Sequence, residues 1–182
     1  MNAFRCRICG DAYLGSQAPS HCPFCGAHWE YIVELAMYPE DINRITITEV
    51  ERDDLAAAIQ LETGNARFYL ALGSRTDRPE LASAYKRLAK IETEHCELFA
   101  KLAGTSMPKE IREAGTAQGD WCASIEESEA RELTAMNFYA QAALRATNER
   151  IREVFSAISA VEADHIEVDV LLARIAGCSP NE

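Results

Sequence analysis

The sequence predicts an all-α protein, a four-helix bundle with one long crossover, preceded by a small domain built around four cysteines. Three observations support this prediction. Glu62 is followed 30 residues later by a Glu-x-x-His motif, and Glu132 is followed by a second one at the same distance. Apolar residues recur at helical period through four segments, and two Cys-x-x-Cys-Gly motifs lie near the N-terminus. The 182-residue chain is long enough for a bundle of about 130 residues and one small module that depends on a metal.

The N-terminal domain, expected over residues 1–36, is predicted to hold one metal ion. A Cys-x-x-Cys turn lets both thiolates reach the same ion, and the glycine after it permits a left-handed backbone that points amides at sulfur. Four thiolates suit iron or zinc, while disulfides are the alternative that paired motifs disfavour. His21 and His28 lie near the motifs and are expected on the surface, because four cysteines complete the site. The ligands are Cys6, Cys9, Cys22 and Cys25.

A linker and four helices are predicted after this domain. The linker, residues 37–49, contains Pro39 and an alternating stretch, which favours an extended connection. The bundle is expected over residues 50–178. Its second and third helices are separated by residues 104–119, long enough for a crossover and containing a possible short helix at 109–114. The helices are expected near 50–73, 78–103, 120–147 and 149–176.

Six side chains of the repeat are predicted to bind two metal ions inside the bundle and to carry its catalysis. Residues three apart share a helix face, so Glu92 and His95 point the same way, within an apolar stripe. Four carboxylates in an apolar interior would each cost several kcal/mol unless cations neutralised them. Carboxylate and imidazole together suit iron, manganese or zinc. The predicted ligands are Glu62, Glu92, His95, Glu132, Glu162 and His165.

Other residues near the repeat are less strongly assigned. A lone Glu-x-x-His is more often a solvated surface pair, but two at one offset from a second Glu favour ligands. Glu129 is a possible additional ligand, although it breaks the repeat and an ion pair or a solvated position fits better. Tyr69 and Tyr139 each follow the first Glu of a repeat by seven residues. They are expected in the core, with hydroxyls bonded to ligating carboxylates.

Three cysteines remain outside the predicted metal sites. Cys96 and Cys122 are expected to be free buried thiols, and the spacing assigns no role to Cys178. Cys96 is next to a predicted ligand, but nothing around it indicates reactivity.

Charge and hydropathy exclude two classes of partner. A formal net charge of −11 and a pI near 4.9 disfavour nonspecific binding to nucleic acid or to anionic membranes. No apolar run approaches the ~20 residues of a membrane helix, and the N-terminus lacks a signal pattern. A cytoplasmic location is expected.

The motifs resemble the rubrerythrin family. The segment FRCRICGDAYLGSQAPSHCPFCGAHWEYI is similar to the short rubredoxin-type domain of rubrerythrins. The segments LETGNARFYLAL, IETEHCELF, ARELTAMNFYAQ and VEADHIEVD resemble the four ligand-bearing helices of its ferritin-like domain. Together these parts cover nearly the whole chain, in the order found in reverse rubrerythrins.

The resemblance implies a cofactor set, an activity and partners. It implies two iron ions in the bundle, one iron (or zinc) in the four-cysteine site, and reduction of hydrogen peroxide to water with electrons relayed through that site. The implied donor is an external flavin-dependent reductase that uses a nicotinamide cofactor. The implied assembly is a homodimer or higher homo-oligomer, with one chain's rubredoxin domain near the other chain's di-iron site.

One departure from the family pattern keeps alternatives open. Typical rubrerythrins carry an additional Glu three residues after the first Glu of the third helix, and this position is Ala135 here. A six-ligand site is also found in relatives that react with dioxygen. Oxygen reduction and ferrous-iron oxidation therefore remain alternatives, and a noncatalytic zinc-binding adapter is a third.

Overall fold

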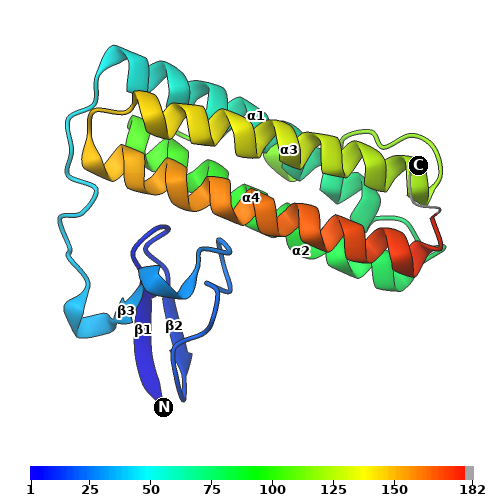
Figure 1. The fold of residues 1–182 in the computed structure, drawn as a ribbon, viewed down its shortest axis with the longest axis horizontal. Helices are drawn as coiled ribbons and strands as arrows, with labels where there is room; N and C mark the ends of the chain where they lie inside the picture. The colour runs from blue at the N-terminus through cyan, green and yellow to red at the C-terminus, as the bar shows by residue number, and fades with distance from the viewer. Residues whose placement is uncertain (179–182) are drawn as a thin grey trace.

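A computed structural model describes residues 1–178, which form a four-helix bundle with a small sheet domain packed against its side (Figure 1). The predicted fold class is confirmed, and each helix ends within two residues of its expected limits. The predicted short helix in the crossover is a single 3-10 turn, η3 (Lys109–Arg112). The bundle helices are α1 (Glu49–Gly73), α2 (Pro79–Ala103), α3 (Trp121–Arg145) and α4 (Glu149–Ala176).

Local sequence signals set the helix ends. Thr48 and Glu51 form a capping box at the start of α1, and Asn148 caps α4 through its side-chain oxygen. Gly104 and Gly177 end α2 and α4 in the left-handed conformation that glycine adopts without strain. α1 therefore pairs with α2 and α3 with α4 as two hairpins, which the crossover joins.

The four-cysteine domain (residues 1–36) is organised by a three-stranded antiparallel sheet. Strand β1 (Asn2–Cys6) lies between β2 (Ala12–Gly15) and β3 (Ile32–Glu34). Two 3-10 turns, η1 (Trp29–Tyr31) and η2 (Leu35–Met37), flank β3. The linker that follows contains turns over residues 39–44 and no strand, so it is irregular rather than uniformly extended. In Figure 1 the cysteine loops are at the end of the sheet that faces α4.

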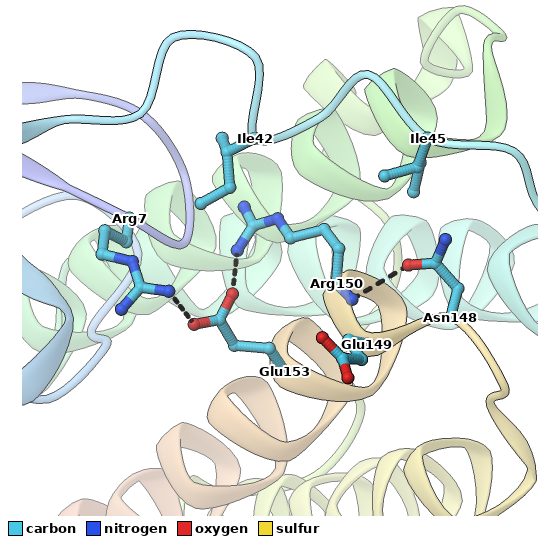
Figure 2. Close-up of a pocket in the computed structure, with 7 residues that line it drawn as sticks. All are labelled: Arg7, Ile42, Ile45, Asn148, Glu149, Arg150 and Glu153. Atoms are coloured by element: carbon cyan, nitrogen blue, oxygen red, sulfur yellow. Dashed lines mark hydrogen bonds and ion pairs between the residues drawn. The ribbon is translucent and has the colours of Figure 1, made fainter.

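Charged contacts anchor this domain to the start of α4. Arg150 is only 6% exposed, and its guanidinium donates to the carbonyl of Ile8 at 2.9 Å and pairs with Glu153 at 2.8 Å. Arg7 pairs with Glu153 as well, at 2.6 Å. These residues border a cavity of about 570 Å³ beneath the linker (Figure 2). Since Arg150 is almost fully desolvated, the network fixes the four-cysteine domain against the bundle.

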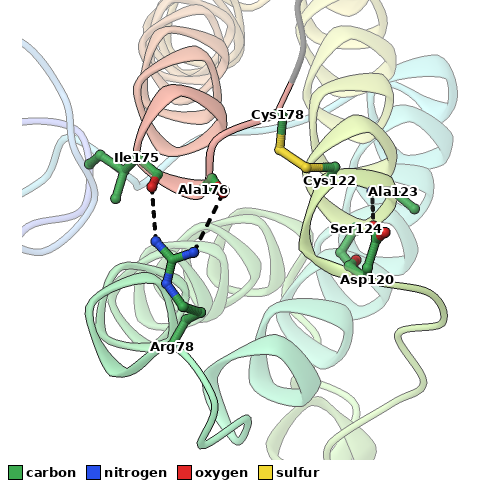
Figure 3. Close-up of a disulfide and its surroundings, with 8 residues drawn as sticks. All are labelled: Arg78, Asp120, Cys122, Ala123, Ser124, Ile175, Ala176 and Cys178. Carbon is green, nitrogen blue, oxygen red and sulfur yellow. Dashed lines mark hydrogen bonds between the residues drawn. A yellow bond between two sulfur atoms is a disulfide. The ribbon is translucent and has the colours of Figure 1, made fainter.

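The far end of the bundle carries a disulfide that the sequence did not indicate. Cys122, expected to be a free buried thiol, is bonded to Cys178, with their Cα atoms 5.5 Å apart (Figure 3). The turn at Gly177 brings Cys178 back to the first turn of α3, and sequence spacing does not reveal this return. Arg78 donates to the last carbonyls of α4 beside it. Cys96 is free and fully buried, as predicted.

Among residues 1–178, none of the helices combines the length and apolar character needed to cross a lipid bilayer.

Candidate metal centres

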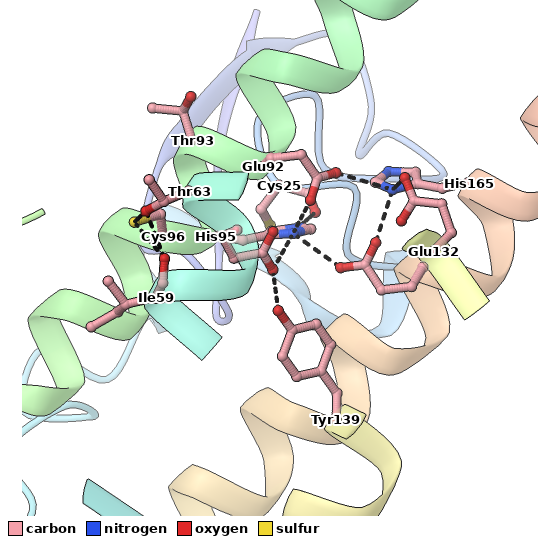
Figure 4. A network of polar contacts seen from close by, with 12 residues as sticks. Cys25, Ile59, Thr63, Glu92, Thr93, His95, Cys96, Glu132, Tyr139 and His165 are labelled. Atoms are coloured by element: carbon pink, nitrogen blue, oxygen red, sulfur yellow. Dashed lines mark hydrogen bonds and ion pairs between the residues drawn. The ribbon is translucent and has the colours of Figure 1, made fainter. Parts of the chain in front are cut away.

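The six predicted ligands of the bundle meet in its interior. Figure 4 labels four of them, Glu92, His95, Glu132 and His165. Each helix contributes according to the repeat: α1 and α3 supply one Glu each, and α2 and α4 supply one Glu-x-x-His pair each. Five of the six side chains are fully buried and His165 is 4% exposed. We call these residues the carboxylate cage: Glu62, Glu92, His95, Glu132, Glu162 and His165.

Two carboxylates of the cage lie between the two imidazoles. Glu162 places one oxygen 3.4 Å from Nδ1 of His95 and the other 3.0 Å from Nδ1 of His165. Glu92 likewise faces both rings, at 4.0 Å from His95 and 3.2 Å from His165. These two carboxylates can therefore bridge two ions.

The other two carboxylates each lie beside one imidazole. Glu62 is 3.5 Å from Nδ1 of His95, and Glu132 is 3.5 Å from Nδ1 of His165. Two groups of potential ligands result, one around each histidine, with Glu92 and Glu162 common to both. The arrangement reproduces the sequence repeat as two equivalent ion positions.

Unpartnered atoms test whether cations fit this cage. Among the described residues, ten buried side-chain nitrogens or oxygens lack a hydrogen-bond partner, and eight belong to the cage. They include Nδ1 of both histidines and at least one oxygen of every carboxylate. Buried polar atoms are rarely left unpaired in this number, because each costs roughly 1–3 kcal/mol. Two divalent cations would pair with them, so the donor set fits a binuclear metal site.

The protonation of the cage shows the same need for positive charge. Burial, together with the neighbouring carboxylates, raises the pKa of Glu92 well above its usual range and that of Glu132 to about 8. Burial alone would lower the pKa of His95 and His165, but the carboxylates outweigh it and hold both pKa values well above the ordinary value. Without metal, protons therefore supply the charge that cations would bring.

The two predicted core tyrosines bond to the cage across the bundle. Tyr139 of α3 donates to Oε1 of Glu62 on α1 at 2.5 Å, and Tyr69 of α1 donates to Glu132 on α3. Each hydroxyl thus holds the carboxylate of the opposite hairpin rather than that of its own helix. Both tyrosines are fully buried, so each fixes a carboxylate oxygen that water cannot reach.

The four predicted cysteines surround one point. Cys6 and Cys25 place their sulfurs 3.8 Å apart, and so do Cys9 and Cys22. Two thiolates bound tetrahedrally to one ion at about 2.3 Å are about 3.8 Å apart, so the spacing matches such a site. The amides of Ile8 and Asp11 point at the sulfurs of Cys6 and Cys9, both at 3.4 Å. The glycines after the motifs are left-handed, as predicted, with φ of 92° and 76°.

A direct hydrogen bond joins the two centres. Nε2 of His95 donates to the carbonyl of Cys25 at 2.8 Å, which directs Nδ1 of the same ring into the cage. Gly26 makes this approach possible, because a Cβ atom there would lie 2.7 Å from Val161 on α4. The contact forms within one chain.

Two acidic residues of the bundle lie outside the predicted ligand set. Glu129 is exposed and belongs to none of the metal-binding groups among the described residues. Asp169 was missed: it is fully buried, accepts from Tyr85 at 2.9 Å, and burial raises its pKa to about 6. Its position one turn after His165 was the available signal. Ala135 is fully buried in the core.

Comparisons with known proteins agree on both parts of the chain. A family model described as rubrerythrin matches residues 53–168, and one described as the rubredoxin-like domain of rubrerythrin matches residues 4–32. Reverse rubrerythrin-1 of Clostridium acetobutylicum is 38% identical over 114 residues, which are 57% of this chain and 63% of that relative. The match thus spans less than two thirds of the relative's length. No solved structure matches the chain.

Proposed function

The chain belongs to the rubrerythrin family, and we propose that it is a di-iron oxidoreductase that reduces hydrogen peroxide to water with electrons relayed through an iron in the four-cysteine site. The reaction consumes two electrons and two protons for each peroxide and yields two waters. The proposal includes an external flavin-dependent reductase as donor and a cytoplasmic location. Rubrerythrin family membership and the geometry of the two centres support it.

The hydrogen bond between His95 and the Cys25 carbonyl is the observation that most directly supports the proposed electron relay. With iron bound by the four cysteines, the Cys25 side chain, its carbonyl, one hydrogen bond and the His95 imidazole would connect that site to the cage. This path contains no gap that solvent would have to fill, because Cys25 and His95 are fully buried.

The residues of the cage have separable roles in this proposal. Two iron ions, when bound, supply the electron pair that the oxidant takes up. Glu92 and Glu162 would bridge the ions, while Glu62 and Glu132 would each bind one ion and are held in place by a tyrosine hydroxyl. Buried tyrosines and an apolar surround exclude bulk water.

A cavity between α1 and α3 is the entry that this proposal assigns to the oxidant. The cavity has a volume of about 430 Å³, and Gly64 and Asn65 form part of its wall. Asn65 is 2% exposed, lies one turn after Glu62, and its Nδ2 has no hydrogen-bond partner among the described residues. An unpaired amide donor beside the cage suits a small oxygen-containing molecule.

The proposed electron relay can be tested with a substitution that shifts the contact between Cys25 and His95 but changes none of the metal-binding residues. Gly26→Ala would bring a Cβ against Val161 and shift the Cys25 carbonyl from His95. Gly10→Ala imposes similar backbone strain in the other cysteine loop, where Cβ would meet only Tyr38. In anaerobically reduced protein mixed with peroxide, we expect reoxidation of the thiolate-bound iron to slow at least tenfold in Gly26→Ala and little in Gly10→Ala. Equal reoxidation rates in the two variants, with metal content retained in both, would contradict the proposed relay.

Ala135 favours a second candidate, reduction of dioxygen or oxidation of ferrous iron. The cage contains six ligands, and a buried methyl group is at the position where typical rubrerythrins carry a further Glu. Stopped-flow mixing of reduced protein with peroxide and, separately, with air-saturated buffer distinguishes the candidates. Faster reoxidation by peroxide supports the peroxidase, and faster reoxidation by oxygen supports the second candidate. A colourless protein with zinc in the four-cysteine site would leave iron oxidation or an adapter role.

A further inference from the structure

Two histidines and one aspartate converge at the junction of the four-cysteine domain and α4. Nε2 of His28 lies 2.7 Å from Oδ2 of Asp164, and Nε2 of His21 lies 3.6 Å from the same oxygen. The potential ligand atoms of the three residues all lie within 4.8 Å of one another. None of them belongs to the carboxylate cage or to the four-cysteine site. We call these residues the junction triad.

The backbone holds the two imidazoles in place. His21 and His28 flank the second cysteine loop and form an isolated antiparallel bridge, so a metal in the four-cysteine site would fix their positions too. Their rings meet edge to face with centroids 4.9 Å apart. Nδ1 of His21 is 3.1 Å from the Ser20 hydroxyl, and this contact leaves Nε2 directed at Asp164. A hydrogen bond at the distal ring nitrogen is typical of metal-ligating histidine.

From this convergence we propose that the junction triad binds a third metal ion, a divalent first-row transition metal such as zinc. Ligand atoms about 2.0–2.1 Å from a tetrahedral ion are about 3.3 Å apart. The observed separations from the Asp164 oxygen, 2.7 and 3.6 Å, lie on either side of this value. Small side-chain rotations therefore suffice, and the half-exposed His21 leaves space for water as a fourth ligand.

An ordinary ion pair explains only part of this arrangement. His28 and Asp164 are within hydrogen-bond distance, so they would dock the domain on α4 without a metal. His21 is beyond that distance, yet its Nε2 is directed at the same oxygen. An ion would use both rings and would join the four-cysteine domain to α4 one residue before the cage ligand His165. The third ion would thus stabilise the contact between Cys25 and His95.

The test uses zinc and the full chain. Protein whose four-cysteine site and cage are already filled with zinc is titrated further against a chromogenic chelator. We expect one additional equivalent to bind. His21→Ala, which removes a half-exposed imidazole and leaves the hydrogen bond between His28 and Asp164 in place, should weaken this equivalent at least tenfold, and Asp164→Asn should do the same. Glu30→Gln, an exposed carboxylate change in the same domain, should leave it unchanged.

A second measurement addresses the docking. Zinc at the third site should slow amide exchange over residues 20–28 in the unaltered protein and not in His21→Ala. The proposal fails if no further zinc binds, or if His21→Ala binds it as tightly as the unaltered protein. Neither result depends on redox activity, so failure here leaves the proposed oxidoreductase function untouched.

Discussion

The four-cysteine domain and the helical bundle both converge on a set of metal-ligating side chains, but they surround it with different amounts of core. Within residues 1–36, four of the seven buried apolar residues are the cysteines themselves. The bundle buries aromatic and aliphatic side chains along all four helices, among them Phe99 and Phe155 packed on Tyr139. A metal in the small domain would therefore take the place of a core, whereas metals in the bundle would neutralise charges that a complete core already encloses.

The largest effect expected from this comparison is unfolding of the small domain alone. Cys9→Ser removes one of four thiolates, and structural zinc sites of this kind contribute about 10–16 kcal/mol to folding. We expect residues 1–36 to lose protection from amide exchange while the helices stay protected. Cys96→Ser, which alters a buried thiol outside both centres, is the control. Protected strands in a metal-free Cys9→Ser protein would show that the domain has a sufficient core of its own.

The bundle should show the reverse behaviour, losing metal without losing its fold. Glu162→Ala removes the carboxylate that faces both histidines, so we expect both cage ions to be lost. Glu62→Ala removes a carboxylate from one position and should also deplete the pair, though less completely. Metal analysis and circular dichroism measure the two effects, with exposed Glu129→Ala as the control. Loss of helix together with the metal would contradict the comparison.

A smaller effect is expected from pH, which should change the stability of the metal-free bundle. In the metal-free bundle, the pKa of Glu132 rises from 4.5 to about 8, and those of Glu92, His95 and His165 also rise. The folded state then holds more protons than the unfolded chain, so the stability gained from them is greatest at low pH and falls as pH rises through these values. The pKa of Glu162 is lowered by the two histidines, despite burial that alone would raise it, and that contribution is lost only below about pH 4.5.

Urea unfolding of metal-free protein checks this sign. We expect the free energy of unfolding of the bundle to fall by an amount on the order of a few kcal/mol between pH 5 and pH 8. Metal-loaded protein provides the control, because ions displace the protons and reverse the trend. A metal-free bundle that is more stable at pH 8 would mean that the cage carboxylates are not protonated in the folded state.

Sequence spacing predicted the residues of both centres because each follows a local geometric rule. A Glu-x-x-His pair must share a helix face, and a Cys-x-x-Cys turn must bring two sulfurs together, so Glu92 with His95 and Cys6 with Cys9 could be predicted without a structure. The helix limits followed from caps and glycines such as Gly104.

Contacts between distant segments could not be predicted in this way. The Cys122–Cys178 disulfide depends on where α4 ends relative to α3. The hydrogen bond between His95 and the Cys25 carbonyl depends on how the four-cysteine domain packs against the bundle. Asp169 received no assignment from the sequence, because a single aspartate one turn after His165 has no counterpart in the repeat and its burial depends on packing. In each case the information lies in the packing of elements rather than in their own sequence.

The smallest expected effect concerns the tyrosine hydroxyls, which orient a metal-binding carboxylate but are not predicted to bind the ion themselves. Tyr139→Phe keeps the ring in the core and removes the hydrogen bond to Glu62. Loss of such a partner typically weakens metal binding 10- to 100-fold, so we expect cage ions to yield to a chelator that much sooner, with the fold and the four-cysteine site unchanged. Tyr69→Phe should act equally through Glu132, because the two hairpins repeat one design. Tyr85→Phe, whose hydroxyl bonds Asp169 rather than a cage residue, is the matched control, and an equal loss of metal there would assign the effect to core packing.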